Sequence, residues 1–353
     1  MSQDQISRRK FVQNSATVAA GAAAGASLAG GAAAADKPDP KKTRSYNEKM
    51  EYRRLGRTNL MISAICIGGH WKKIQSKYNT PEFDKNRRET LSACIDHGIN
   101  YVDACVGQEC MAYSKALEGR RDKMFMGYSW YQRESRFGGW QNSLDKMKEG
   151  FEQGLKECKL EHVDLWRITM HEQTSKRNTP KQIEIAMQAL DWAKKSGKAR
   201  FTGVSSHDRP WIAEAVAKYP QLEVIVTPYT AKTAKAPEGS MFDAFEKHDV
   251  GMFGIKPFAS GSVFKSRGQP DSNTKEEDDK IARMVLRYVL CCKQLTAPIP
   301  GLVTVDQVKN AAKAVTEPRE FSRAEAEEYE QITKNFWDRL PPDYKWLRDW
   351  EWV

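Results

Sequence analysis

A strict alternation of strand-like and helix-like segments is the feature that most constrains the fold of this chain. Residues 51–62 read as two short strands around Gly56, and after them apolar runs alternate with segments of helical periodicity. Such alternation is typical of parallel strands joined by helical crossovers. The expected strands are 63–69, 100–105, 123–130, 162–170, 199–205, 223–227, 250–257 and 297–301, and the expected helices are 88–97, 111–118, 142–159, 180–195, 210–218, 241–248, 278–294 and 305–315.

Eight strand–helix units in about 250 residues match the size of a (β/α)8 barrel. An open doubly wound sheet is the alternative, but no Gly-x-Gly-x-x-Gly follows any of these strands. We therefore predict an α/β protein, a (β/α)8 TIM barrel over residues 51–315 that begins with a β-hairpin. Residues 316–353 form an extension, in which a capping box at 322–325 opens a helix to about residue 340. The aromatic residues after it either pack on one end of the barrel or line a ligand cleft.

The first 35 residues have the pattern of an export signal. The pair Arg8-Arg9 precedes a run of Ala, Gly, Val and Leu at 16–34, and small residues at 33–35 stand before Asp36. We expect residues 1–35 to direct export through the twin-arginine translocation machinery to the periplasm and then to be cleaved. Residues 36–50 should form a solvated linker. The apolar run is short and rich in Ala and Gly, so we expect no stable membrane span in the mature chain.

The composition gives no sign of a nucleic-acid partner or a zinc site. Removing residues 1–35 takes away Arg8, Arg9 and Lys10 together with Asp4, so the net charge falls from +10 to +8. Both signs of charge are mixed along the chain, and no basic block alternates with aromatic residues, so the basicity favours solubility. The seven cysteines include no Cys-x-x-Cys pair. Oxidation is conceivable for two pairs that are close in sequence, Cys105 with Cys110 and Cys291 with Cys292.

Asp103 is the most prominent candidate for a site residue. It lies at the end of the strand-like run 100–105, and active sites of (β/α)8 barrels are built at the C-terminal ends of the strands. His70, His171 and His207 also follow expected strands, so they could join Asp103 in a metal-assisted hydrolase. They could equally form local hydrogen bonds. No His-x-His or similarly spaced pair supports a metal, and we predict none.

Eight short runs, taken together and in order, resemble the aldo-keto reductase family. They are YRRLGRT (52–58), GINYVDA (98–104), GRRDK (119–123), VDLW (163–166), GKAR (197–200), GVSS (203–206), KPFASG (256–261) and IPG (299–301). The resemblance implies a (β/α)8 barrel closed at its bottom by the hairpin. It also implies an NADPH-dependent carbonyl reductase that uses a tetrad of Tyr, Lys, Asp and His at the C-terminal ends of the strands.

Only part of that tetrad is present in this chain. Asp103 matches the Asp of the family, but the following loop, CVGQEC at 105–110, is about two residues shorter and contains no Tyr. Counting from the run at 119–123 places Ser129 where the family has Lys. Counting from Asp164 places Thr169 where the family has His, although His171 follows two residues later.

A carboxylate that has lost its Lys needs another cation, because an unpaired buried charge costs several kcal/mol. Side chains alternate between the two faces of a strand. If Thr169 points into the barrel, Arg167 does too, while Trp166 and Ile168 face the helices. We therefore expect Arg167 or Lys256 to pair with Asp103.

The resemblance also indicates a set of nicotinamide-binding residues. They are Ser205 and Ser206 after the fifth strand, Lys256, Phe258 and Gly261 after the seventh, and Gly301, Thr304 and Gln307 after the eighth. Family members often hold a 2′-phosphate with Lys and Arg at the positions that are Gly301 and Thr304 here. Loss of these two cations disfavours NADP relative to NAD or to no cofactor. Residues 316–353 contain no Cys, so the iron–sulfur segment found in one branch of the family is missing.

The resulting expectation is an exported oxidoreductase that transfers hydride between NADP or NAD and a small carbonyl or alcohol substrate. Asp103 would be its polar anchor, Arg167 the partner of Asp103, and His171 the proton donor or oxyanion partner. Free nicotinamide nucleotides are scarce outside the cytoplasm, so a tightly held nucleotide would have to be folded in before export. The alternative is a barrel that binds a carbonyl or sugar-like ligand without redox turnover.

Overall fold

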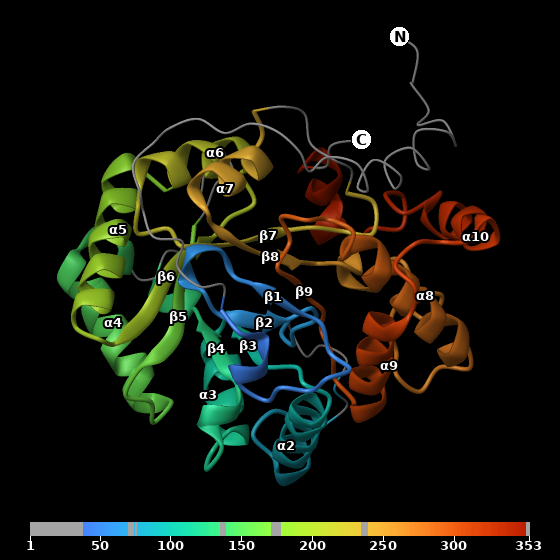
Figure 1. Cartoon of the computed structure of the whole chain (residues 1–353). Coiled ribbons are helices and arrows are strands. Elements are labelled where there is room, and N and C mark those ends of the chain that lie inside the picture. Colours follow the sequence, from blue (N-terminus) through green and yellow to red (C-terminus); the bar gives the residue numbers. More distant parts are fainter. Residues whose placement is uncertain are drawn as a thin grey trace. The chain divides into compact units, whose positions relative to one another are not determined.

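Seven parallel strands in chain order form the central sheet (Figure 1). The computed structural model describes residues 38–69, 74, 76–134, 139–170, 178–233 and 239–350. The expected export signal therefore lies outside the described residues, as do His70, His171 and Trp352. The strands are β3 (Tyr101–Ala104), β4 (Phe125–Tyr128), β5 (Val163–Thr169), β6 (Ala199–Ser205), β7 (Val224–Pro228), β8 (Gly251–Ile255) and β9 (Ala297–Ile299).

The sheet closes into a barrel through two residues rather than through a full eighth strand. Ile67 bridges Val102 of β3, and Gly68 bridges Gly301 just after β9, both in parallel orientation. The expected strand over 63–69 is thus reduced to Ile67 and Gly68, because the chain bends through residues 64–66 as it leaves the hairpin. A Cβ on Gly68 would lie 2.6 Å from the Ile299 side chain and 2.9 Å from the Asp103 carbonyl oxygen, so closure requires glycine here.

Helices follow the strands and surround the barrel as predicted (Figure 1). They are α2 (Pro81–Asp96), α3 (Gly107–Ala116), α4 (Leu144–Glu157), α5 (Pro180–Lys195), α6 (Arg209–Lys218), α7 (Met241–His248), α8 (Lys275–Val289) and α9 (Val305–Thr316). α2 begins seven residues before the expected 88, since the Thr80 side chain accepts a hydrogen bond from the Phe83 N–H and Pro81 occupies the first turn. None of the described helices is long and apolar enough to cross a bilayer.

Two apolar layers hold the barrel together. Inside it, Tyr101 stacks on Phe253 with ring centroids 4.2 Å apart. The hairpin of β1 (Tyr52–Arg54) and β2 (Met61–Ser63) adds Leu55 and Ile62 to this inner cluster, so it covers the N-terminal end of the strands as expected. Outside the sheet, a larger cluster packs the helices against the strands, and Trp166 stacks on Phe151 of α4 at 3.9 Å. The parity prediction that Trp166 faces the helices is confirmed.

Residues 38–50, expected to be a solvated linker, are bonded to the barrel. Arg44 donates to the Asp164 carboxylate at 3.0 Å and to the Met124 carbonyl, and the Asn100 side chain donates to the Thr43 hydroxyl. Met50 is buried. The polar composition of this segment reflects hydrogen bonds to the barrel bottom, a role that charge and Pro content do not reveal.

Asp164 links the N-terminal ends of several strands and gives the fold a testable pH dependence. Its buried carboxylate pairs with Arg44, Arg121 and Arg200 at 3.0, 2.7 and 2.7 Å. Burial alone would raise the pKa of Asp164, but the guanidinium groups of Arg121 and Arg44 outweigh it and hold this pKa below its ordinary value. A carboxyl whose pKa is depressed by folding stabilises the fold above its unfolded-state pKa, and this contribution is lost as the pH falls through the folded-state value.

We expect Asp164→Asn to lower the free energy of unfolding at pH 7 by about 1–2 kcal/mol, a value reduced by the solvent exposure of the arginines. The deficit should shrink as the pH falls below about 3.9, the ordinary aspartate pKa, because the wild type loses the same charge there. Urea unfolding at pH 7 and pH 3 measures both numbers. An equal deficit at the two pH values would show that the ion cluster does not supply the stability.

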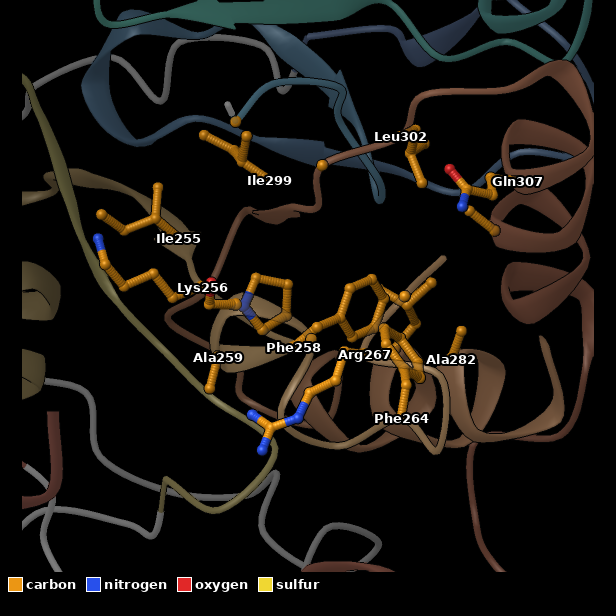
Figure 2. Close-up of a pocket in the computed structure, with 18 of the residues that line it drawn as sticks. Ile255, Lys256, Phe258, Ala259, Phe264, Arg267, Ala282, Ile299, Leu302 and Gln307 are labelled. Atoms are coloured by element: carbon orange, nitrogen blue, oxygen red, sulfur yellow. The ribbon is translucent and has the colours of Figure 1, made fainter. Parts of the chain in front are cut away.

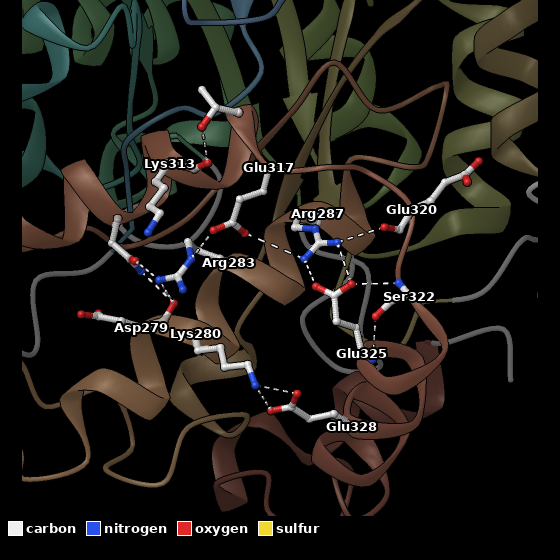
Figure 3. A network of polar contacts seen from close by, with 12 residues as sticks. Asp279, Lys280, Arg283, Arg287, Lys313, Glu317, Glu320, Ser322, Glu325 and Glu328 are labelled. Atoms are coloured by element: carbon white, nitrogen blue, oxygen red, sulfur yellow. Dashed lines mark hydrogen bonds and ion pairs between the residues drawn. The ribbon is translucent and has the colours of Figure 1, made fainter.

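The C-terminal extension is attached to the barrel by ion pairs with α8. Arg287 pairs with Glu325 at 2.5 Å, Arg283 with Glu317 at 2.7 Å, and Lys280 with Glu328 at 2.6 Å (Figure 3). The hydrogen bond from Arg287 lowers the pKa of Glu325 to about 2. Glu325 also completes the predicted capping box of α10 (Arg323–Thr333) with Ser322. The segment that follows, Pro342–Trp350, is a 3-10 helix.

Candidate functional site

A cleft with a volume of about 320 Å³ opens at the C-terminal ends of the strands. One part of it lies at the barrel mouth, around Asp103 and Arg167. The other runs along the loop after β8 and between α8 and the start of α9 (Figure 2). The two parts share one continuous lining, so a ligand bound in the second can reach the polar groups at the mouth.

Arg167 is the partner of Asp103. Its Nε donates to Asp103 Oδ1 at 2.9 Å and its Nη2 to Asp103 Oδ2 at 2.5 Å, a two-point contact between buried side chains. Burial alone would lower the pKa of Arg167, but the charge and hydrogen bonds of Asp103 raise this pKa above its ordinary value, so the pair stays ionised. The prediction that Arg167 or Lys256 pairs with Asp103 is confirmed, and Arg167 is the partner. Lys256, the other candidate, has its Nζ 3.4 Å from His207 Nε2.

Tyr101 adds a hydroxyl to this pair. Its Oη donates to Asp103 Oδ1 at 3.2 Å from the same strand, two residues away and therefore on the same face. Burial and the neighbouring Asp103 charge raise the pKa of Tyr101 well above its usual range. Two other tyrosines close to Asp103 in sequence do not join the pair: Tyr128 packs on Phe151 of α4, and Tyr113 contacts Arg87 of α2.

The two residues that the resemblance places at the Lys and His positions, Ser129 and Thr169, are neighbours in the structure, and Glu134 contacts Ser129. The hydroxyls of Ser129 and Thr169 are 3.0 Å apart, and Ser129 Oγ donates to the carboxylate of Glu134 at 2.7 Å. Thr169 lines the cleft, whereas Ser129 and Glu134 are buried behind it. Sequence counting placed Ser129 and Thr169 but missed Glu134, which lies after β4 at the end of the 3-10 helix Tyr131–Arg133. Tyr131, in the same segment, also lines the cleft and was missed.

Most residues of the expected nicotinamide set line the cleft. Ser205, Lys256, Phe258, Gly261, Gly301, Thr304 and Gln307 all do so. Ser206 is not part of the cleft lining: it is buried, and its hydroxyl accepts from the Asp208 N–H at the start of α6, so its role in nicotinamide binding stays a prediction. Neighbouring residues of an extended chain point to opposite faces. Of the two serines, only Ser205 therefore reaches the cleft.

The loop after β8 has the backbone of a tight cradle. Lys256, Ala259, Ser260 and Gly261 all have positive φ angles. A Cβ on Gly261 would overlap the carbonyl oxygen of Arg267, so this turn needs glycine. Figure 2 shows the loop residues facing Leu302 and Gln307 across the cleft. Thr304 caps α9 by accepting from the Gln307 N–H, and the Gln307 side chain accepts from the Val303 N–H, which fixes the opposite wall.

Two cationic side chains that were not predicted from the sequence also line the cleft. They are Arg267 and Lys275. Arg267 donates to the Arg339 carbonyl at 2.7 Å, and Lys275 pairs with Asp279 at 2.7 Å. Gly301 and Thr304 bring no positive charge to the cleft. Arg267, in the loop before α8, and Lys275, at the start of α8, do. The choice between NADP and NAD stays a prediction.

The aromatic tail contributes to the mouth of the cleft. Tyr344 lines it, and Trp346 stacks on His207 with centroids 4.3 Å apart. Leu347 is buried, so the same short helix both packs on the barrel and borders the cleft. Within the described part of the chain, no group of three His, Cys, Asp or Glu side chains could hold a metal, and all seven cysteines are free.

Comparisons with known proteins agree on one family. The sequence model of the Aldo/keto reductase family matches residues 64–334. The oxidoreductase YrpG of Bacillus subtilis is 26% identical over 310 residues, covering 75% of this chain and 91% of YrpG. The L-galactose dehydrogenase of Arabidopsis thaliana is 22% identical over 291 residues, covering 76% of this chain and 89% of that enzyme.

Solved structures show the same fold. An aldo-keto reductase from Bacillus halodurans in its holo form superposes with a TM-score of 0.60 at 21% identity, over 84% of this chain and 99% of that one. An aldo-keto reductase from Klebsiella pneumoniae in complex with NADPH gives 0.61 at 17% identity, over 84% and 97%. With a barrel closed by Ile67 and Gly68, a cleft at the strand ends and a family match over most of its length, this chain belongs to the aldo/keto reductase family.

Proposed function

We propose that this protein is a nicotinamide-dependent oxidoreductase that interconverts a small carbonyl compound and the corresponding alcohol. The observation that carries the proposal is the continuous cleft that joins the Asp103–Arg167 pair to the cradle formed by the loop after β8 and the start of α9. Family membership supports the same reaction class.

The residues present fit a dinucleotide. Ser205 would hold the carboxamide of the nicotinamide, while Lys256 and the N-terminal end of α9 would hold the phosphates. Phe258 and Leu302 offer apolar surface to the rings. When bound there, the cofactor supplies or accepts hydride. Gly261 and Gly301 leave room for its close approach, and Thr304 and Gln307 shape the wall of α9.

Arg167 would bind and polarise the substrate oxygen. Asp103 fixes its guanidinium by two hydrogen bonds, and Arg167 lines the cleft. A fixed cation aimed at an oxygen that gains negative charge lowers the barrier to hydride arrival. We keep His171, two residues after the end of β5 in the sequence, as a proposed proton donor or oxyanion partner. The twin-arginine pattern of residues 1–35 supports the further proposal that the protein acts in the periplasm with a tightly held nucleotide.

Nucleotide binding tests the proposal. We expect NADH or NADPH to bind with a change in its fluorescence, or a nucleotide to be released when the purified protein is denatured. Lys256→Ala should weaken binding about tenfold, because it removes a charge-assisted contact worth about 1.4 kcal/mol. Lys265→Ala is the matched control, since Lys265 pairs with Glu277 at 2.6 Å outside the cleft lining. If neither nucleotide binds and none is released on denaturation, the redox proposal is wrong. The alternative, a barrel that binds a ligand without redox activity, would then be favoured.

A further inference from the structure

Glu134 is a buried acid directly behind the mouth of the cleft. Its carboxylate accepts four hydrogen bonds, from Trp130 N, Trp166 Nε1, Ser129 Oγ and Thr169 N, at 2.8, 2.9, 2.7 and 3.3 Å. Only 3% of Glu134 is exposed. Ser129 and Trp130 belong to the segment after β4, and Trp166 and Thr169 belong to β5, so the carboxylate is held in one place at the ends of two neighbouring strands.

A chain of hydroxyl groups connects this acid to the cleft. Ser129 uses its one hydroxyl proton to donate to Glu134 Oε2, so it must accept from the Thr169 hydroxyl, 3.0 Å away. Thr169 Oγ1 in turn accepts from Arg167 Nη1 at 3.5 Å, and Thr169 lines the cleft. All hydroxyls thus point away from the cleft, which is the arrangement needed to receive a proton from a ligand.

We propose that Thr169, Ser129 and Glu134 form a proton relay, with Glu134 as the final proton acceptor when an alcohol substrate is oxidised. The inference rests on the proposed function. Thr169 is the member that would touch the substrate, and Glu134 is a positioning residue that acts through the two hydroxyls. The relay takes the proton-transfer role of the missing Tyr and leaves His171 the other role proposed for it, that of an oxyanion partner.

The proton balance of the relay is simple. In the oxidation direction the substrate carbon loses hydride to NAD(P)+, and the substrate O–H bond breaks. Thr169 takes that proton and gives its own to Ser129, and Ser129 gives its own to Glu134 Oε2. One protonated carboxyl and one carbonyl result. In the reduction direction each transfer reverses, and Glu134 supplies the proton to the new alcohol.

The surroundings of Glu134 favour proton uptake. Burial raises its pKa above the ordinary value, against the opposing effect of the hydrogen bonds from Trp166 and Ser129. Two ionisable groups that interact with Glu134 are Tyr128 of β4 and Cys110 of α3. Arg133 precedes Glu134 in the chain, and Arg167 of β5 contacts the relay at Thr169. Oxidation needs the ionised carboxylate, so its rate should fall as the pH drops through the pKa of Glu134, whereas the rate of reduction should rise.

The test uses Thr169→Val and Ser129→Ala, each of which interrupts the relay, with Thr169→Ser as the matched control that keeps the hydroxyl. Reduction of 4-nitrobenzaldehyde and oxidation of 4-nitrobenzyl alcohol are followed with both nucleotides. We expect the two interrupting variants to lose about 10²-fold in kcat, the low end for a positioned acid or base. They should also lose the pH dependence assigned to Glu134, while Thr169→Ser, which keeps the hydroxyl, should keep this pH dependence even if its rate is lower.

The controls separate the relay from the proposed function. Nucleotide binding and thermal unfolding should stay close to wild type in all three variants, so failure of nucleotide binding in the wild type overturns the function rather than the relay alone. Wild-type rates and pH profiles in both interrupting variants would overturn the relay.

Infrared titration decides the case independently of turnover. The carboxyl band of Glu134 is identified by its shift in Ser129→Ala, which removes one hydrogen bond. A titration above the ordinary glutamate pKa of about 4.3 supports the relay, and one at or below that value overturns it.

Discussion

Replacing Asp103 with Ala will lower the free energy of unfolding by about 3–5 kcal/mol, because the substitution leaves the Arg167 guanidinium buried without its counterion. Only 2% of the Arg167 side chain and 5% of the Asp103 side chain are exposed, so water cannot replace the lost partner. The expected loss is a large fraction of the stability of an ordinary domain. Urea unfolding followed by tryptophan fluorescence measures it.

Two further variants show whether the loss comes from the orphaned charge. Asp103→Leu combined with Arg167→Met should recover most of the stability, since a buried pair can often be replaced by apolar residues at little cost. Glu89→Ala removes an exposed partner of Lys85, 3.9 Å away, and should change the free energy of unfolding by less than about 0.5 kcal/mol. A loss below about 1 kcal/mol for Asp103→Ala would show that water or another group compensates Arg167.

The Asp103–Arg167 pair could be predicted from the sequence because side chains alternate between the two faces of a strand. Side chains two residues apart share a face, so fixing Thr169 on the inner face also fixed Arg167 there and Trp166 on the outer one. Arg167 and Trp166 lie as that rule requires. The rule needs only the strand and one anchor residue, and both were available from the alternating pattern and the family-like runs.

Glu134 could not be predicted in this way because its surroundings depend on contacts between distant segments. It caps the C-terminal end of a 3-10 helix of only three residues, Tyr131–Arg133, which is too short to show a helical period in the sequence. One of its donors, Trp166, is 32 residues away on another strand. The sequence signal was an acid five residues after Ser129, which becomes meaningful only when Ser129 is known to be buried.

Helices α2 and α3 begin earlier than predicted, and the sequence contains a local signal for the first of these starts. Thr80 followed by Pro81 is a helix start, but the polar residues after it obscured the apolar period until about residue 88. The helix at Gly107 began early for a different reason: buried Glu109 accepts from the Cys105 N–H and ties the helix start directly to the strand end. The loop behind Asp103 is therefore reduced to Cys105 and Val106, between the end of β3 and the start of α3.

Gly127→Ala is the second change for which we expect a large effect, because it adds a methyl group beside the Asp103 site. Gly127 pairs with Asp103 in the parallel register of β3 and β4. A Cβ there would overlap the Tyr101 hydroxyl and lie 2.7 Å from Asp103 Oδ1. The inner layer of the barrel leaves Tyr101 no room to move, since its ring stacks on Phe253. We expect a loss of unfolding free energy at the upper end of about 1–3 kcal/mol, the range for overpacked cores.

The double variant Gly127→Ala with Tyr101→Phe identifies the cause. Removing the Tyr101 hydroxyl takes away the nearest atom that the new methyl group meets, so the double variant should be more stable than Gly127→Ala alone. Tyr101→Phe alone should cost about 1 kcal/mol, the value of its hydrogen bond to Asp103. Urea unfolding of the three proteins yields the coupling energy. Simple additivity of the two single changes would contradict the proposed clash and place the strain of Gly127→Ala in the backbone of β4.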